Sequence, residues 1–184
     1  RPDEVPRIRG MLGEFKVNLA AQMSLDPDKY AVIPNITLPA PGGRTSQIDH
    51  LIISQYGVFV IETKNMRGWI YGSEKDKKWT QVLYKSKRRF LNPLRQNHAH
   101  VHAVAQVLGI PEAKILPLVV CAGDAIFKTP IPANVFRQDS FVGYIKSKTQ
   151  KLLSCREVRD LVGKVLDRRP IPGRRTRPPH PHPG

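Results

Sequence analysis

Two apolar segments joined by a very short connection constrain the fold of this chain most strongly. Residues 45–54 and 57–64 are rich in Ile, Val and Phe, as strands that are buried on both faces are. Only Gln55 and Tyr56 lie between them, so the two strands are expected to pair across a tight turn. The elements around this pair predict an α/β fold with a central mixed β-sheet.

A first helix is expected over residues 7–23, where apolar side chains recur at helical spacing. The core-facing stripe of this helix is expected to be Ile8, Met11, Leu12, Phe15, Leu19 and Met23. A second stripe of smaller residues contains Gly10, Glu14, Val17 and Ala21. The Glu14 carboxylate would therefore face a closely packed region rather than bulk water.

The other elements follow from apolar runs and from residues typical of turns and caps. They are a strand in 30–38 interrupted near Pro34–Asn35, a hairpin at 69–71 and 78–84 that extends the sheet, a helix at 93–108, a buried strand at 115–121 and a last helix at 155–168. Asn92 and Gly109 bound the second helix, and Ser154 with Glu157 forms a capping box. The 115–121 strand is expected to be parallel to an earlier one, because it follows a helix.

Composition and charge favour a single basic domain. Residues 1–168 are expected to form it, and residues 169–184, rich in Pro, Arg and His, to form a disordered basic tail. Thirty Lys and Arg against 15 Asp and Glu favour nucleic acid as partner over anionic membrane or acidic protein. No apolar run approaches the roughly 20 residues of a membrane span. Cys121 and Cys155 match no disulfide or zinc spacing, so a soluble cytoplasmic protein is expected, with no signal for an oligomeric state.

Three charged residues interrupt the apolar strands. Glu62 and Lys64 project from one face of their strand, because strand side chains alternate. If the turn has two residues, Asp49 lies directly opposite Glu62 on that face, whereas a three-residue loop would put the carboxylates on opposite faces. His50 points to the other face, which suggests packing or a supporting hydrogen bond.

Adjacent buried carboxylates repel each other, and a divalent cation relieves that repulsion. Carboxylate oxygens with water suit Mg²⁺ or Mn²⁺, and a neighbouring Lys64 would orient water or offset charge on a phosphate. The structural alternative is a cross-strand ion pair at a sheet edge. On the second helix, Gln96 and His100 share one face at i and i+4, separate from the apolar stripe. His98 and His102 are also i, i+4 neighbours, but a solvated role is favoured over a metal site.

The motifs, taken in order, resemble the nuclease-related domain (NERD) family. They are Gln47-Ile48-Asp49-His50-Leu51, Gly57-Val58-Phe59-Val60-Ile61-Glu62-Thr63-Lys64-Asn65 and Asn92-Pro93-Leu94-Arg95-Gln96-Asn97, with Gly13-Glu14 upstream and Trp79 between. The resemblance covers residues 10–109 closely. An isolated E-x-K is a weak signal, whereas the ordered set of Glu, Asp, E-x-K and N-P-x-x-Q is specific.

That family is similar to the PD-(D/E)XK nucleases, so the resemblance implies a restriction-endonuclease-like core in the order α-β-β-β-α-β. It implies that Asp49 and Glu62 bind Mg²⁺, helped by the Thr63 carbonyl, and that Lys64 activates water. Glu14 would be an accessory carboxylate, and Gln96 would contact a water or the scissile phosphate. The expected activity is metal-dependent hydrolysis of nucleic acid, with DNA favoured over RNA.

A basic cluster follows the charged strand and could hold phosphates on either side of the cut. It consists of Lys75, Lys77, Lys78, Lys85, Lys87, Arg88 and Arg89. Trp69 and Tyr71 are candidates for stacking on bases, whereas Trp79 is expected in the core. Two alternatives stay open: a nucleic-acid-binding module that keeps the fold without cutting, and an interaction domain whose charged strand is structural.

Overall fold

The computed structural model describes the backbone of residues 4–168 and the side chains of residues 10–168. The expected basic tail and the Ile8 side chain lie outside the described residues. The first half contains α1 (Glu4–Ser24), β1 (Tyr30–Ala40), β2 (Arg44–Ser54), β3 (Gly57–Asn65), β4 (Trp69–Tyr71), β5 (Lys78–Leu83) and β6 (Ser86–Leu91). The second half contains α2 (Pro93–Leu108), β7 (Ile115–Ala122), β8 (Ile126–Phe127), β9 (Val135–Arg137), α3 (Phe141–Ser147) and α4 (Cys155–Leu166).

A five-stranded mixed sheet forms the centre, in the order β1-β2-β3-β7-β9. The strands β1, β2 and β3 are antiparallel neighbours, whereas β7 runs parallel to both β3 and β9. The expected α/β class, the core order α-β-β-β-α-β and the parallel strand after the second helix are confirmed. β3 lies in the middle, which explains why residues from Gly57 to Thr63 are all buried.

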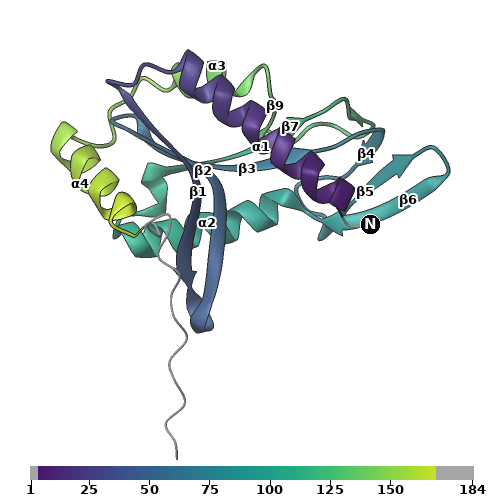
Figure 1. Cartoon of the computed structure of the whole chain (residues 1–184), viewed down its shortest axis with the longest axis horizontal. Coiled ribbons are helices and arrows are strands. Elements are labelled where there is room, and N and C mark those ends of the chain that lie inside the picture. Colours follow the sequence, from purple (N-terminus) through teal and green to yellow (C-terminus); the bar gives the residue numbers. More distant parts are fainter. Residues whose placement is uncertain (1–3, 169–184) are drawn as a thin grey trace, which may run out of the picture.

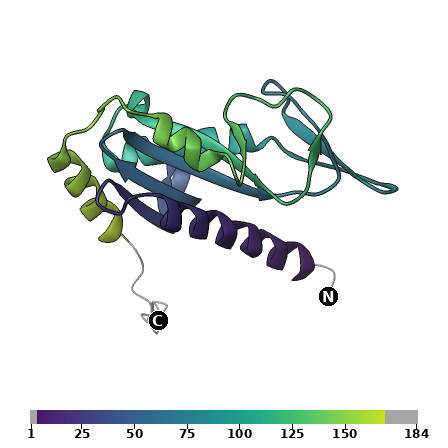
Figure 2. The same cartoon turned by 90° about the horizontal axis from the view of Figure 1, so that it is seen from above.

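Helices cover both faces of this sheet (Figures 1 and 2). On one face, α1 and α3 pack through Val17, Ala21 and Phe141 onto Phe59 and Ile61. The opposite face is covered by α2 and α4, whose apolar residues include Val101, Val104, Leu108, Leu161 and Val165. No helix within residues 4–168 is both long and apolar enough to cross a bilayer.

The expectation for the core-facing stripe of α1 is wrong. Met11, Leu12, Phe15, Leu19 and Met23 are 45–78% exposed, and the small-residue stripe packs on the sheet instead. The reason is the short distance between helix and sheet. A Cβ added to Gly13 would lie 3.0 Å from the Asn65 Cβ and 3.5 Å from the Ala122 Cβ. Large side chains do not fit into that space, so they remain on the outer side of the helix.

The hairpin expected to extend the central sheet belongs instead to a second sheet of four strands, in the order β6-β5-β4-β8. The chain turns sharply at Gly68, which has φ +69, and a Cβ there would lie 2.4 Å from the Val82 carbonyl oxygen. This turn directs β4 away from the central sheet. Trp79 is fully buried between the two sheets, as expected, and packs edge-on against Phe90 and Phe127.

The connection between β2 and β3 is the expected two-residue turn, with Ser54 paired to Gly57. The pairing continues to His50 and Ile61, so the register is the one that sets Asp49 opposite Glu62. The β2–β3 ladder ends one position short of Asp49, while β2 continues as a long arm paired with β1 (Figure 1). β1 is one strand across Pro34–Asn35, although Asn35 has a φ of 53° and no ladder partner.

The expected caps at Asn92, Gly109 and Ser154 are confirmed, whereas α1 begins three residues earlier than expected and α4 ends at Leu166. The Asn92 side chain accepts a hydrogen bond from the Leu94 amide, and Gly109 ends α2 in the left-handed conformation. Ser154 and Glu157 form the capping box of α4. The short elements α3, β6, β8 and β9 were not expected, because segments of two to seven residues carry little periodicity. Both cysteines are free, Cys121 buried and Cys155 exposed.

Candidate active site

Asp49 lies where β2 separates from β3. The last pair of the β2–β3 ladder is His50 with Ile61. After Ile61 the β3 backbone has no partner on β2, and the Asp49 carboxylate takes that place. Its Oδ2 accepts a hydrogen bond of 2.7 Å from the Thr63 backbone amide. In the described part of the chain, its second oxygen accepts no hydrogen bond. One carboxylate oxygen of Asp49 is therefore left for another ligand.

Glu62 is 3% exposed, and each of its oxygens has one partner. Lys64 Nζ lies 2.7 Å from Oε1, on the same face of β3. His100 Nε2 lies 3.2 Å from Oε2. A carboxylate this deeply buried is costly without such partners, so Lys64 and His100 are what keep it charged in the metal-free protein.

The α2 helix supplies the side chains opposite β3. Gln96 Oε1 accepts a hydrogen bond of 3.0 Å from Lys64 Nζ, and His100, one turn further on, reaches Glu62. The other ring nitrogen of His100, Nδ1, lies 2.6 Å from Ser46 Oγ on β2. Asn97 Nδ2 donates to the carbonyls of Val60 and Leu118, which ties this end of α2 to β3 and β7. The helix is thus held in register with Lys64 and Glu62.

Glu14 approaches from the other helix, α1. It is half-buried, and its influence on the other carboxylates is electrostatic. The close contact of Gly13 with β3 at Asn65, next to Lys64, sets the position of the helix turn that carries Glu14. The expected group of Glu14, Asp49, Glu62, Lys64 and Gln96 is therefore brought together by α1, β2, β3 and α2.

Three carboxylates surround one lysine in this group, and their mutual repulsion and burial shift their pKa values. Burial raises the pKa of Asp49 to about 7, and the charges of Glu62 and Glu14 act in the same direction, against the Thr63 hydrogen bond. Burial also raises the pKa of Glu14, again helped by the charge of Glu62. For Glu62, burial alone would raise the pKa, but the hydrogen bonds from His100 and Lys64 outweigh it and lower the pKa. The site is therefore short of positive charge.

The donor set suits a hard cation. Asp49 and Glu62 offer carboxylate oxygens on adjacent strands, and a cation bound between them would offset the burial and the like charge that raise the pKa of Asp49. Among residues 4–168, no group of three or more His, Cys, Asp and Glu side chains is arranged to bind a metal. An ion here would therefore take its remaining ligands from water, from backbone carbonyls or from substrate, as Mg²⁺ commonly does.

A cavity of about 200 Å³ opens directly beside Lys64 and Gln96. Its far wall is the inner face of the small sheet, with Gln81, Arg88 and Phe90. The cavity joins the charged cluster to one member of the expected basic cluster, Arg88. The other members, Lys75, Lys77, Lys78, Lys85, Lys87 and Arg89, are exposed on β5, β6 and the loops around them.

Sequence reasoning missed two residues of this site. His100 was placed on the Gln96 face without a role, although that shared face was the signal for its position. Ser46 carried no signal, because its contact with His100 depends on the bend of β2 away from β3. His98 and His102 do not form a pair: His98 is exposed, and His102 Nδ1 lies 3.0 Å from Glu112 Oε1.

Comparison with known proteins places these features in one family. The family model for the nuclease-related domain matches residues 9–122. An uncharacterised protein of Bacillus anthracis is 47% identical over 100 residues, which cover 54% of this chain and 47% of the relative. The matched part thus spans less than half of that relative's length. No solved structure matches this chain. The match to the family model covers more than half of the chain and includes the whole Asp49, Glu62, Lys64 and Gln96 cluster. The chain belongs to the nuclease-related domain family.

Proposed function

We propose that this protein is a metal-dependent nuclease of the PD-(D/E)XK branch, which hydrolyses phosphodiester bonds of nucleic acid, DNA in preference to RNA. One observation carries the proposal. Two carboxylates, Glu62 buried and Asp49 half-buried, converge with a lysine and a glutamine at the end of β3. An arrangement in which burial and a like charge drive a carboxyl pKa from 3.8 to about 7 is typical of catalytic centres.

Asp49 and Glu62 are the residues that would hold Mg²⁺ or Mn²⁺, with the Thr63 carbonyl as a further oxygen ligand. When bound, the ion supplies Lewis-acid stabilisation of the phosphate and lowers the pKa of a water. Asp49 has an oxygen available, and the site lacks positive charge, so both the donor chemistry and the charge balance support this assignment. Glu14 adds negative charge from α1 and would orient water in the outer shell.

Lys64 is the residue best placed to act on the attacking water or on the phosphate. Its ammonium group is held between Glu62 Oε1 and Gln96 Oε1, at 2.7 and 3.0 Å. Both contacts are to acceptors, so the amine is oriented without being buried: its side chain is 27% exposed. A phosphate entering the adjacent cavity would meet Lys64 on one side and Arg88 on the other, which supports charge stabilisation during cleavage.

The test is a cleavage assay on labelled DNA and RNA, single- and double-stranded, linear and circular, with Mg²⁺, Mn²⁺ or EDTA. Asp49→Asn and Lys64→Ala are compared with the parent. Lys146→Ala, which removes one exposed positive charge on α3, is the matched control for Lys64. Cutting in either metal but not in EDTA, reduced at least about hundredfold in both site variants and unchanged in the control, is the expected result.

Cutting that is unchanged in both site variants contradicts the assignment of the active centre. If no substrate is cut with either metal while nucleic acid still binds, the nuclease proposal fails and the non-cleaving binding module is the correct reading. If Glu62→Ala strongly lowers stability and metal leaves the melting temperature unchanged, the charged strand is structural.

A further inference from the structure

The outer face of the small sheet combines exposed aromatic rings with basic side chains. Directly opposite residues in a sheet share a face. The register therefore puts Trp69 in one row with Ile126, Val82 and Lys87, and Tyr71 in the next row with Thr80 and Arg89. The opposite face carries Ile70, Trp79 and Phe90, which are in the core. We call the first set the outer face of the small sheet.

The two aromatic residues on this face lack the burial that usually explains such side chains. Trp69 is 47% exposed and Tyr71 is 38% exposed, whereas Trp79 on the inner face is fully buried. They are two residues apart on β4, so their rings project in the same direction about 7 Å apart. Two base-sized rings side by side on an open strand are the arrangement on which successive nucleobases stack.

Positive charge accompanies both rings. Lys87 and Arg89 lie two strands away from Trp69 and Tyr71, about 10 Å at ordinary strand spacing. On the other side, Lys128 Nζ lies 4.6 Å above the Trp69 ring. No residue of β4, β5, β6 or β8 is acidic. Each ring thus has a cation in its row. The spacing between ring and cation suits a nucleotide, in which a sugar separates the base from the phosphate.

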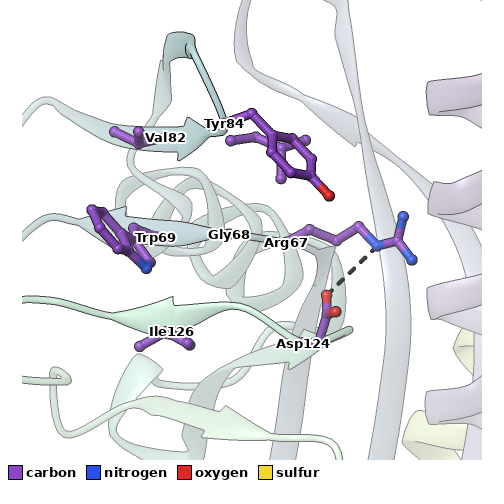
Figure 3. A pocket seen from close by; sticks show the side chains of 8 residues that line it. Arg67, Gly68, Trp69, Val82, Tyr84, Asp124 and Ile126 are labelled. Atoms are coloured by element: carbon purple, nitrogen blue, oxygen red, sulfur yellow. Dashed lines mark ion pairs between the residues drawn. The ribbon is translucent and has the colours of Figure 1, made fainter.

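A cavity of about 680 Å³ continues from Trp69 along the same side (Figure 3). In Figure 3, Trp69, Val82 and Ile126 line one end, and the Arg67–Asp124 ion pair, 3.5 Å between Nε and Oδ1, lies at the other. Tyr84 stands at the rim, 96% exposed and with φ +53, a conformation unfavourable for an aromatic residue. Tyr84 is the first residue of the two-residue turn between β5 and β6, and this turn accounts for its positive φ and places its exposed ring at the mouth of the cavity.

We infer that the outer face of the small sheet, with this cavity, is an anchoring site for single-stranded nucleic acid. Bases stack on Trp69 and Tyr71, and the phosphates contact Lys87, Arg89 and Lys128. A duplex keeps the faces of its bases stacked inside, so only a single strand can use the rings. The inference deepens the proposed function, from which it takes nucleic acid as the substrate class. The inner face of the same hairpin lines the cavity beside Lys64. A nucleic-acid strand anchored on the outer face therefore lies one sheet thickness from the charged cluster.

The site is tested by binding, without catalysis. Labelled oligonucleotides, single-stranded and duplex, are titrated in EDTA with the full chain carrying Asp49→Asn, and affinity is read by anisotropy. In that background, Trp69→Ala and Tyr71→Ala are each expected to weaken single-strand binding about tenfold, within the range for one base–aromatic stack, and to leave duplex binding unchanged. Phe15→Ala removes a ring on α1 that is 62% exposed and is expected to change nothing.

Two further readouts make the test specific. Trp69 is the exposed tryptophan and Trp79 is fully buried, so a bound single strand should quench the fluorescence that Trp69→Phe removes. Tyr84→Asn should weaken binding while keeping or raising the melting temperature, since Asn tolerates positive φ. If the Tyr84 ring had a structural role, Tyr84→Asn would lower the melting temperature instead.

The inference is overturned if Trp69→Ala and Tyr71→Ala bind single strands as tightly as the parent does. It is also overturned if Phe15→Ala loses as much single-strand affinity as they do, or if they lose duplex affinity to the same extent. Competition by polyglutamate as strong as by the oligonucleotide also overturns it, because that result assigns the face to acidic polypeptides. The two proposals fail separately. Ring-dependent binding without cleavage leaves the anchoring site standing, whereas metal-dependent cleavage with ring-independent binding leaves only the nuclease.

Discussion

The carboxylate of Asp49 and the backbone amide of Thr63 are joined by a 2.7 Å hydrogen bond at the point where β2 no longer pairs with β3. A side chain thus replaces a missing strand partner. The bend of β2 opens the sheet at this point, and the hydrogen bond holds Asp49 next to Glu62 despite their repulsion. The same opening lets Ser46, farther along β2, reach His100.

Asp49→Asn should stabilise the metal-free protein at neutral pH. The pKa of Asp49 is raised from 3.8 to about 7, so the native state binds a proton more tightly than the unfolded chain. Its contribution to stability therefore falls as the pH rises from about 4 to about 7 and stays low above that. Removing this carboxylate should increase the free energy of unfolding at pH 8 by on the order of 2 kcal/mol. Urea denaturation in EDTA measures the change.

His50 makes the pH profile of that variant diagnostic. Burial lowers the pKa of His50 to about 4, against the hydrogen bond with the Glu14 backbone. Between pH 4 and 6.5 the His50 side chain is protonated in the unfolded chain but neutral in the native state. The contribution of His50 to stability therefore rises as the pH rises from 4 to 6.5. In the parent it opposes that of Asp49. Asp49→Asn should unmask it, and a variant whose stability still falls between pH 4 and 7 would contradict the assignment.

Mg²⁺ should raise the melting temperature of the parent but not of Asp49→Asn or Glu62→Gln. A ligand that binds only the native state, present at ten times its dissociation constant, adds roughly 1.4 kcal/mol, or about 3–5 °C for a chain of this size. Differential scanning fluorimetry with MgCl₂ and with EDTA gives the shift. Asp26→Asn, at an exposed carboxylate after α1, is the control and should keep the shift. Equal shifts in all four proteins would place the ion elsewhere.

His100→Ala should cost more stability than a surface histidine does. The change leaves Ser46 Oγ and Glu62 Oε2 without their hydrogen-bond partners in a buried region, which costs about 1–3 kcal/mol. It should also raise the pKa of Glu62, because the His100 hydrogen bond is the largest effect that lowers it. Carboxyl NMR titration follows that pKa. His102→Ala, on the exposed side of the same helix, should change stability by less than about 0.5 kcal/mol and leave Glu62 unaffected.

Much of the site was accessible from the sequence because its geometry is local. The two-residue turn and the period of two in a strand determine that Asp49 and Glu62 share a face, and the caps at Asn92 and Gly109 place Gln96 on α2. These relations need only neighbouring residues along the chain. The family resemblance brought Gln96 into the same site as Lys64, with a water or the scissile phosphate as its expected partner. Its direct contact with Lys64 was not predicted, because it requires that α2 cross β3.

The remainder depends on distances between elements, which no periodicity encodes. The rule that the larger apolar stripe faces the core failed for α1, because the helix approaches β3 too closely for Phe15 or Leu19. The separate small sheet depends on the turn at Gly68. Ser46 joined the site through a bend in β2 that begins at an unpaired Asp49.

Gly13 should therefore be the least replaceable glycine of α1. In Gly13→Val, the added side chain meets Asn65 and Ala122, so α1 has to move off β3 and carry Glu14 with it. Overpacking of this kind costs about 1–3 kcal/mol, read as a lower midpoint in urea. Gly10 lies three residues earlier on the same helix and has nothing within 4 Å of an added Cβ. Gly10→Val should change stability by less than about 0.5 kcal/mol, since Val and Gly have similar helix propensities. Equal effects at the two positions would mean that the helix does not pack as closely on β3 as the contact with Asn65 indicates.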